Sequence, residues 1–262
     1  IEAYRKTIAL APNSASAYNN LGLVLQQKGN KAESITALRK AVELNPKEAQ
    51  YAYNLGFALK NNGEASAAGV AFAKCLALDP KRYDAHMAVA ELQSSAGKDA
   101  EALEHYKAAA AIKPNEFSPL YNQGVIYSRM AQFGNAATAF EAAVKVNPDD
   151  AEALGGLGWA LFKSGKPNEG ITTLRQATAK DPMLLSAWLN LATALTAQEQ
   201  YTDAVPAWEA ALRIKPNHLA ANINLGNLYI RTGSYEKAVS AYQAAANIDP
   251  KSADAHYGAG LA

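Results

Sequence analysis

The chain has 262 residues and carries 25 Lys and Arg against 24 Asp and Glu. This near-neutral balance excludes a strong electrostatic attraction to nucleic acid or to anionic membranes. No apolar run reaches the roughly 18 residues of a membrane-spanning helix, and the first residues lack the charged-then-apolar order of a signal peptide.

Prolines mark a repeat that extends along the whole chain. Eight of the eleven prolines are spaced 34 residues apart. They are Pro12, Pro46, Pro80, Pro114, Pro148, Pro182, Pro216 and Pro250. A fixed period of this length is typical of a repeat array rather than of an ordinary globular domain.

With the recurring proline at repeat position 32, the chain divides into seven complete units and two partial ones. The complete units are 15–48, 49–82, 83–116, 117–150, 151–184, 185–218 and 219–252, and the partial units are 1–14 and 253–262. We therefore expect 1–262 to form a single repeat domain. Because the chain starts inside a unit and lacks an initiator methionine, we interpret it as a fragment of a longer protein.

The first half of each unit has the pattern of an amphipathic helix. In the second complete unit, Leu55, Gly56 and Leu59 occupy positions 7, 8 and 11, and other units repeat this pattern. Such spacing places the residues on one helix face. Gln93 departs from the pattern at position 11. Position 15 holds a glycine in five units, where a left-handed helix end is expected.

The second half of each unit predicts a second helix. Small residues recur at positions 20 and 27 and large ones at position 24, as Ala238, Ala245 and Tyr242 illustrate. The residue before a proline is disfavoured in a helix, so this helix ends near position 31. Each unit is therefore a helical hairpin, and no strand pattern is present. Helices of about 13 residues are marginal alone, so we predict stacked hairpins in an all-α superhelix, or solenoid.

Two departures fall near the joint between the fifth and sixth units. Lys180 replaces the apolar residue at position 30, and Pro206 lies inside the predicted second helix of the sixth unit. A proline there removes one hydrogen bond and bends the helix slightly. We expect this joint to be the least regular one.

These columns resemble the tetratricopeptide repeat family, whose signature combines W-x2-L-G-x2-Y, A-x3-F and P on a period of about 34 residues. The matching residues of the seventh unit are Leu225, Gly226, Tyr229, Ala238, Tyr242 and Pro250. The resemblance covers the whole chain. It implies a right-handed superhelix whose first helices line a concave channel, and it implies that the channel binds a protein or peptide.

The face of each first helix opposite its packing stripe is the candidate binding surface. A face that met only solvent would be polar, but this one carries aromatic and aliphatic side chains. The candidate apolar contacts are Tyr53, Phe57, Met87, Tyr121, Val125, Trp159, Phe162 and Leu189. The alternative interpretation is that these residues pack against the first helix of the next unit.

Position 6 of the first helices forms an asparagine column. Its members are Asn20, Asn54, Asn122, Asn190 and Asn224. An amide side chain both donates and accepts hydrogen bonds, so the column suits the backbone of an extended peptide. It resembles the asparagine ladder in the superhelix of O-linked N-acetylglucosamine transferases. Alternatively, the asparagines reflect local hydrogen bonding that is common to generic tetratricopeptide repeats.

Basic residues are missing where one type of channel would need them. No Lys or Arg stands at positions 2, 5, 6 or 9 of the complete units. The channel therefore lacks the basic clamp with which chaperone-binding members of the family hold a terminal carboxylate. A neutral or mildly amphipathic segment, extended or helical, is the preferred ligand.

No arrangement of residues indicates catalysis, a metal site or a cofactor. His86 and His256 fall in the packing column at position 4, and no histidine has a partner at a metal-like spacing. Cys75 falls in a small-residue column, where a buried structural thiol is expected rather than a nucleophile. A single cysteine excludes an internal disulfide, which favours a cytoplasmic location, although a periplasmic protein without disulfides would look the same.

Three functions fit this pattern. The first is a protein-interaction scaffold without enzyme activity, which binds a segment of a partner protein in its channel. The second is the substrate-recognition arm of a longer enzyme, such as a glycosyltransferase. The third is a self-associating array, because the stacking surfaces at both ends lack polar caps.

Overall fold

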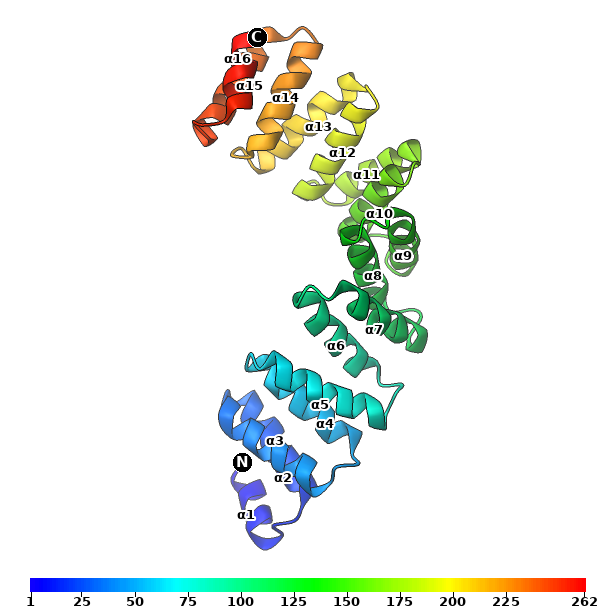
Figure 1. Ribbon diagram of the computed structural model, residues 1–262, viewed down its shortest axis with the longest axis vertical. Helices are drawn as coiled ribbons and strands as arrows, with labels where there is room; N and C mark the ends of the chain where they lie inside the picture. The colour runs from blue at the N-terminus through cyan, green and yellow to red at the C-terminus, as the bar shows by residue number, and fades with distance from the viewer. The chain divides into compact units, whose positions relative to one another are not determined.

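The computed structural model describes all residues, 1–262, and contains sixteen α-helices and no strand (Figure 1). This confirms the all-α prediction. The helices are α1 (Glu2–Leu10), α2 (Ala15–Gln27), α3 (Lys31–Leu44), α4 (Ala49–Asn61), α5 (Ala65–Leu78), α6 (Tyr83–Ser95), α7 (Asp99–Ile112), α8 (Phe117–Arg129), α9 (Phe133–Val146), α10 (Ala151–Lys163), α11 (Pro167–Lys180), α12 (Leu185–Ala197), α13 (Tyr201–Ile214), α14 (Leu219–Arg231), α15 (Tyr235–Ile248) and α16 (Ala253–Leu261). None of them is both long and apolar enough to cross a membrane.

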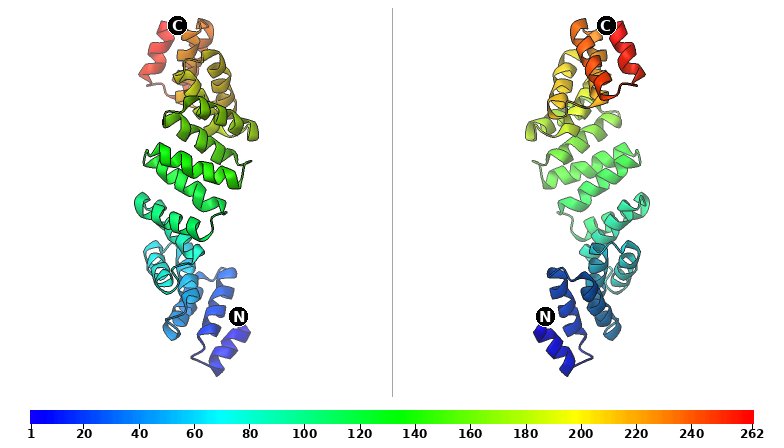
Figure 2. Two further views of the ribbon diagram at one scale, coloured as in Figure 1. Left: turned by 90° about the vertical axis from the view of Figure 1, so that its right-hand side faces the viewer. Right: turned by 90° about the vertical axis from the view of Figure 1, so that its left-hand side faces the viewer.

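The helices pack into two compact units, an N-terminal unit of Ile1–Pro119 and a C-terminal unit of Leu120–Ala262. Within each unit the helices form antiparallel hairpins that are stacked in chain order (Figure 2). The hairpins of the N-terminal unit pair α2 with α3, α4 with α5 and α6 with α7. The expectation of one domain over 1–262 stays a prediction.

A close approach between a small and a large residue holds each hairpin together. Gly56 of α4 faces the ring of Phe72 on α5, and a Cβ atom at position 56 would lie 2.8 Å from that ring. Gly226 of α14 faces Tyr242 of α15 in the same way, also at 2.8 Å. The small residues at repeat position 8 therefore pack against the large residues at repeat position 24, as the sequence predicts.

The turns inside the hairpins use the left-handed conformation expected at position 15. All five glycines of that column have positive φ, for example 84° at Gly63 and 91° at Gly165. Where the glycine is missing, Ala131 and Glu199 take the same conformation, with φ of 56° and 57°. A residue with a Cβ atom adopts this conformation at a cost of about 1–2 kcal/mol. The shape of the hairpin turn therefore overrides the preference of these two residues.

The first helices form one side of each stack. Within the C-terminal unit α10 contacts α12, and α14 contacts α16, while α2 contacts α4 in the N-terminal unit. Successive second helices, such as α3 and α5 or α11 and α13, do not pack against each other to the same extent, and neither do α4 and α6 or α12 and α14. We call the side that the first helices form the first-helix face of each unit.

Neither of the two predicted departures interrupts a helix. Helix α13 continues through Pro206 from Tyr201 to Ile214. Lys180 ends α11 and pairs with Asp149, which places its charge outside the packing between α11 and α12. The expected irregularity at this joint has no counterpart in the helix boundaries.

Two mid-helix glycines of the N-terminal unit give opposite predictions for stability. A methyl group at position 56 would push against the Phe72 ring, whereas one at position 69 of α5 would meet no atom within 4 Å. Alanine favours a helix over glycine by about 1 kcal/mol, and overpacking costs about 1–3 kcal/mol. We expect Gly69→Ala to raise the midpoint of thermal unfolding and Gly56→Ala to lower it. Circular dichroism melting curves measure both, and equal shifts would contradict the packing described above.

Candidate protein-binding site

The first-helix face of the N-terminal unit is the side of α2, α4 and α6 that points away from their packing stripes. On α4, Tyr53 and Phe57 lie one turn apart with nearly parallel rings, at a centroid distance of 6.3 Å. Tyr53 is half-buried and also packs against Phe72 at 5.7 Å, while Phe57 is 41% exposed. Met87 of α6 is half-buried. Tyr53 thus contributes to the wall of the unit, and Phe57 is the side chain that a ligand can reach.

Charges around these rings are largely engaged within the chain. The guanidinium of Arg82 lies over the Tyr53 ring, 4.6 Å from its centroid. Burial raises the pKa of the Tyr53 hydroxyl, and the nearby carboxylate of Asp84 raises it further. Lys60 of α4 pairs with Glu91 of α6. The face therefore carries no surplus of one charge, which agrees with a ligand that is neutral or mildly amphipathic.

A chain of side-chain hydrogen bonds crosses the same face. Arg82 Nη2 donates to Gln50 Oε1 (2.6 Å), and Gln50 Nε2 donates to Asn54 Oδ1 (2.7 Å). Asn54 Nδ2 donates to Asn19 Oδ1 (2.7 Å), and Asn19 Nδ2 donates to Asn20 Oδ1 (3.2 Å). Arginine only donates hydrogen bonds, so Arg82 fixes the orientation of every amide that follows.

This series of hydrogen bonds gives two asparagines of the predicted column different roles. Asn54 is buried, and its oxygen and its nitrogen are both bonded within the chain. Asn20 is half-buried and accepts from Asn19, and its own NH2 group has no acceptor in the chain. Asn54 therefore belongs to the wall, and Asn20 presents hydrogen-bond donors on the face.

Arg82 is a residue of this site that the repeat columns did not single out. It directly precedes α6, at a position where Ser14, Glu48 and Asp150 cap their helices with side-chain oxygens. Arg82 makes no such cap, and its Nε is buried without a hydrogen-bond acceptor. A cation where other units have capping residues was the signal in the sequence.

The first-helix face of the C-terminal unit carries a second aromatic pair. Trp159 and Phe162 of α10 stack at a centroid distance of 5.5 Å, and Lys163 Nζ lies 5.7 Å from the Trp159 ring centroid. Trp159 is half-buried. Phe162 and Leu189 pack in part against the core of this unit. The stacked pair is thus anchored on one side and accessible on the other.

Helix α8 contributes side chains that are mostly tied to the wall. Tyr121 packs edge-on against Phe140 at 5.7 Å, and its hydroxyl donates to Glu152 Oε2 at 3.1 Å. Burial, together with Glu152, raises the pKa of Tyr121 to about 12. Val125 packs against the same cluster as Tyr121. These two residues favour the packing interpretation over direct ligand contact.

The remaining asparagines of the column keep their amides free. Asn122 and Asn190 are half-buried and Asn224 is exposed, and no hydrogen bond within the chain engages their side chains. The column is interrupted at Gly156 for a steric reason, because a Cβ atom there would lie 2.6 Å from the Phe140 ring. Whether these amides hold a ligand stays a prediction.

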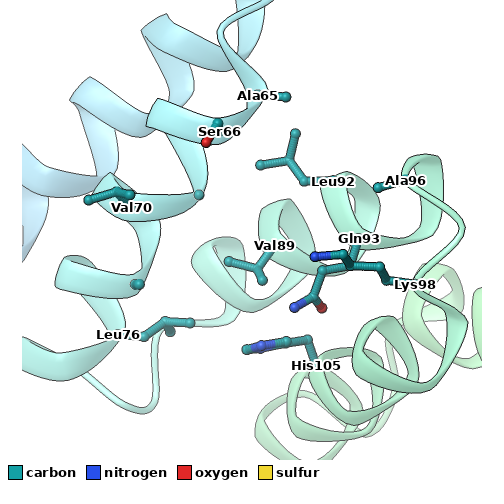
Figure 3. A pocket seen from close by; sticks show the side chains of 12 residues that line it. Ala65, Ser66, Val70, Leu76, Val89, Leu92, Gln93, Ala96, Lys98 and His105 are labelled. Carbon is teal, nitrogen blue, oxygen red and sulfur yellow. The ribbon is translucent and has the colours of Figure 1, made fainter.

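Several hollows of the structure lie on the opposite side, between second helices. A cleft of about 560 Å³ separates α5 from α7, with α6 as its floor (Figure 3). A cleft of about 300 Å³ lies on the other side of α5, toward α3. In the C-terminal unit a cleft of about 360 Å³ lies between α11 and α13. The sequence columns did not predict a site on this outer side.

Two histidines meet beside the cleft between α5 and α7. His86 Nδ1 and His105 Nδ1 are 2.9 Å apart, and His86 Nε2 lies 3.0 Å from the carbonyl oxygen of Pro80. His86 thus takes part in packing, as position 4 predicts. No group of three or more His, Cys, Asp or Glu side chains comes together as a metal site requires. Cys75 is fully buried beside Ala52 and Ala85, and burial raises the pKa of its thiol.

Stacked helical hairpins with an accessible aromatic face define a helical-repeat solenoid. Tetratricopeptide repeat profiles match most of its length. The matches cover 15–48, 49–82, 121–183, 156–218, 189–253 and 223–262. The chain belongs to the tetratricopeptide repeat family, as the sequence columns predicted.

Solved structures of other repeat proteins share this fold. YrrB, described as a TPR protein with an unusual peptide-binding site, is 22% identical with a TM-score of 0.60, over 71% of this chain and 96% of its own. The C-terminal part of a repeat protein from Cytophaga hutchinsonii is 17% identical with a TM-score of 0.75, over 91% and 98% of the two chains. PilF of Pseudomonas aeruginosa is 18% identical with a TM-score of 0.65, over 82% and 97%.

No functionally curated protein matches the chain at a significant level. Family and fold together support a protein-interaction scaffold, a class whose members are typically not catalytic. At identities below one quarter, the solved structures carry information on the fold alone.

The histidine pair makes stability depend on pH. Burial holds the pKa of His105 below its usual value of 6.5, His86 lowers it further, and Glu104 acts in the opposite direction. The folded chain then binds fewer protons at His105 than the unfolded chain, so the free energy of unfolding falls as pH drops below 6.5 toward the folded pKa. We expect His105→Ala to lose less stability than the wild type between about pH 7.5 and about pH 5.5. Urea unfolding at both pH values measures this difference, and parallel losses would contradict it.

Proposed function

We propose that the chain is a protein-interaction scaffold that binds an extended or helical segment of a partner protein on its first-helix faces. The observation that carries this proposal is the accessible aromatic surface of Phe57 in the N-terminal unit and of the Trp159–Phe162 pair in the C-terminal unit. Aromatic side chains that are held rigidly and remain accessible are typical anchors of protein interfaces.

The polar groups beside these rings support a peptide segment rather than a fully apolar ligand. Asn20 offers donors next to the N-terminal rings, and Asn122, Asn190 and Asn224 offer free amides in the C-terminal unit. A peptide backbone presents donors and acceptors at every residue, so free amides can pair with it without selecting a side chain. The peptide-binding site described for YrrB is a further argument by analogy.

We propose that the chain itself has no catalytic activity and serves recognition only. A substrate-recognition arm of a longer enzyme is compatible with the same faces, because it would bind a protein segment in the same way. Asn54 weakens the version of this alternative in which a continuous asparagine ladder binds the peptide. Its amide oxygen and its amide nitrogen are both hydrogen-bonded within the protein. A continuous asparagine ladder is therefore not the basis of the proposal.

The first test removes one anchor from each face. Phe57→Ala and Trp159→Ala each take away accessible ring surface, and truncation of a central aromatic anchor typically costs about 2 kcal/mol or more of binding free energy. We expect each change to reduce recovery of the partner in quantitative affinity capture, with far-UV circular dichroism unchanged. Tyr235→Ala is the matched control, because Tyr235 is 55% exposed on α15, a second helix. Unchanged capture by both anchor variants would contradict the proposal.

A further inference from the structure

The cleft between α5 and α7 collects several residues that depart from the repeat pattern. Its walls come from α5 on one side and from α6 and α7 on the other, as Figure 3 shows for Val70, Leu92 and His105. We call this hollow, together with its neighbour between α3 and α5, the outer clefts. All of these helices belong to the N-terminal unit.

The α5 wall is hollow because two of its side chains are unusually small. Gly69 occupies position 21 of its repeat, where other second helices carry Ile35, Leu103 and Ile171. Ala73 occupies position 25, where other second helices carry long polar side chains such as Arg39, Lys107 and Arg175. Helix α5 consequently has one charged residue, Lys74.

Nothing in the fold requires the glycine at position 69. Its φ is negative, and a Cβ atom there would meet no atom within 4 Å. Glycine in the middle of a helix costs about 0.5–1 kcal/mol relative to alanine. The missing side chain of Gly69 leaves open volume at the cleft, which a side chain of a bound partner can occupy.

The opposite wall carries two polar residues where the repeat is apolar or small. Gln93 takes position 11, which is Leu or Tyr in most units, and its Oε1 is buried without a donor. His105 takes position 23, which is Ala in most units. An unpaired buried acceptor costs about 1–3 kcal/mol. Gln93 and His105 therefore bring polar groups to a wall that is apolar or small in most units.

The hydrogen bonds of the histidine pair also leave an acceptor at the cleft. The carbonyl of Pro80 only accepts, so His86 Nε2 carries a proton, and in the neutral ring His86 Nδ1 is then an acceptor. His105 Nδ1 must be the donor to it across 2.9 Å. The remaining nitrogen, His105 Nε2, is therefore an acceptor without a partner in the chain.

Apolar surface continues across α5 from one outer cleft to the other. Val70 lines both clefts and is 71% exposed, and Leu78 is exposed on the same helix. A small ligand held in one cleft would leave this ridge uncovered. A helix laid across α5 would cover Val70 and place one side chain on either side of it.

The charged side chains that line the outer clefts are all basic. Arg39 and Lys74 line the cleft toward α3, and Lys98 lines the cleft toward α7, whereas no carboxylate lines either of them. Lys74 and Lys98 have no ion-pair partner, and Arg39 pairs with Glu64 at 3.6 Å. By contrast, the cleft between α11 and α13 includes Asp203.

We propose that α5 and the outer clefts form a second interaction surface, which binds an amphipathic helix of a partner protein whose apolar stripe is flanked by carboxylates. The apolar stripe covers Val70 and inserts a side chain above Gly69, and the carboxylates meet Lys74 and Lys98. A hydroxyl or amide donor on that helix reaches His105 Nε2. This surface lies on the opposite side of the hairpins from the first-helix face, and it does not depend on ligand binding there.

The test uses a synthetic helix as the probe. It is a fluorescent, acetylated and amidated peptide of about 14 residues, or roughly four turns, with leucines on one face and glutamates on both flanks. One companion peptide has lysine in place of each glutamate, and a second has alanine in place of each leucine. We expect fluorescence anisotropy to give a Kd below about 100 µM for the acidic leucine peptide and much weaker binding for both companions.

Variants of the chain then locate the binding. Gly69→Leu fills the hollow with a good helix former, so we expect it to keep or raise the melting temperature while weakening the acidic peptide at least about tenfold. Gly134→Leu is the matched control, since Gly134 is a helical glycine of α9 with equally open space. Lys74→Glu combined with Lys98→Glu should reverse the preference toward the lysine peptide. Tyr235→Ala, on α15 and outside both proposed surfaces, should leave binding unchanged.

Three results would overturn the proposal. The first is equal affinity of the acidic peptide for the wild type and Gly69→Leu, and the second is equal affinity of the leucine and alanine peptides, which would mean attraction by charge alone. The third is no binding up to about 1 mM, where the free energy of association would be too small for a specific helix site.

Discussion

Every other feature of this chain depends on the contact between a small residue of the first helix and a large residue of the second. At Gly56 the helix backbone approaches the Phe72 ring so closely that a Cβ atom would lie 2.8 Å away. This contact buries one face of each helix and sets the distance between the two helices. One hairpin cannot bury enough apolar surface to be stable, so stacking neighbours supply the rest, and stability accumulates interface by interface. The faces that stacking leaves uncovered are the ones on which we propose that partners bind.

The sequence predicted the fold well because each helix and turn repeats the same local rules. Helix boundaries followed from the apolar spacing and the recurring proline, and the left-handed turn followed from the glycine column. Ala131 and Glu199 show the limit of that reasoning. Their own preferences argue against positive φ, and only the packing of the two helices imposes it. A column identifies the position that needs the conformation, but tertiary packing enforces it where the favoured residue is missing.

The candidate site was predicted less completely, because a helical wheel gives direction and not burial. Tyr53 and Phe57 point to the same face, but the ring of Phe72 draws Tyr53 into the wall and leaves Phe57 accessible. The role of Asn54 depends on Gln50 and on Arg82, which donates a hydrogen bond to Gln50 from the opposite end of the same repeat, 32 residues away in sequence. A repeat pattern relates residues at equivalent positions of successive repeats. It does not reveal a contact between residues at positions that are not equivalent.

Departures from the repeat pattern were more informative than agreement with it. The generic columns explain how the hairpins stack, and for that reason they say little about what distinguishes this chain from other members of its family. Gly69, Gln93 and His105 each look like a tolerated exception when taken alone, but the fold brings all three to one cleft. Helix α6 carries Met87 toward the first-helix face and Gln93 toward that cleft. Helix α6 therefore contributes a residue to each of the two proposed surfaces.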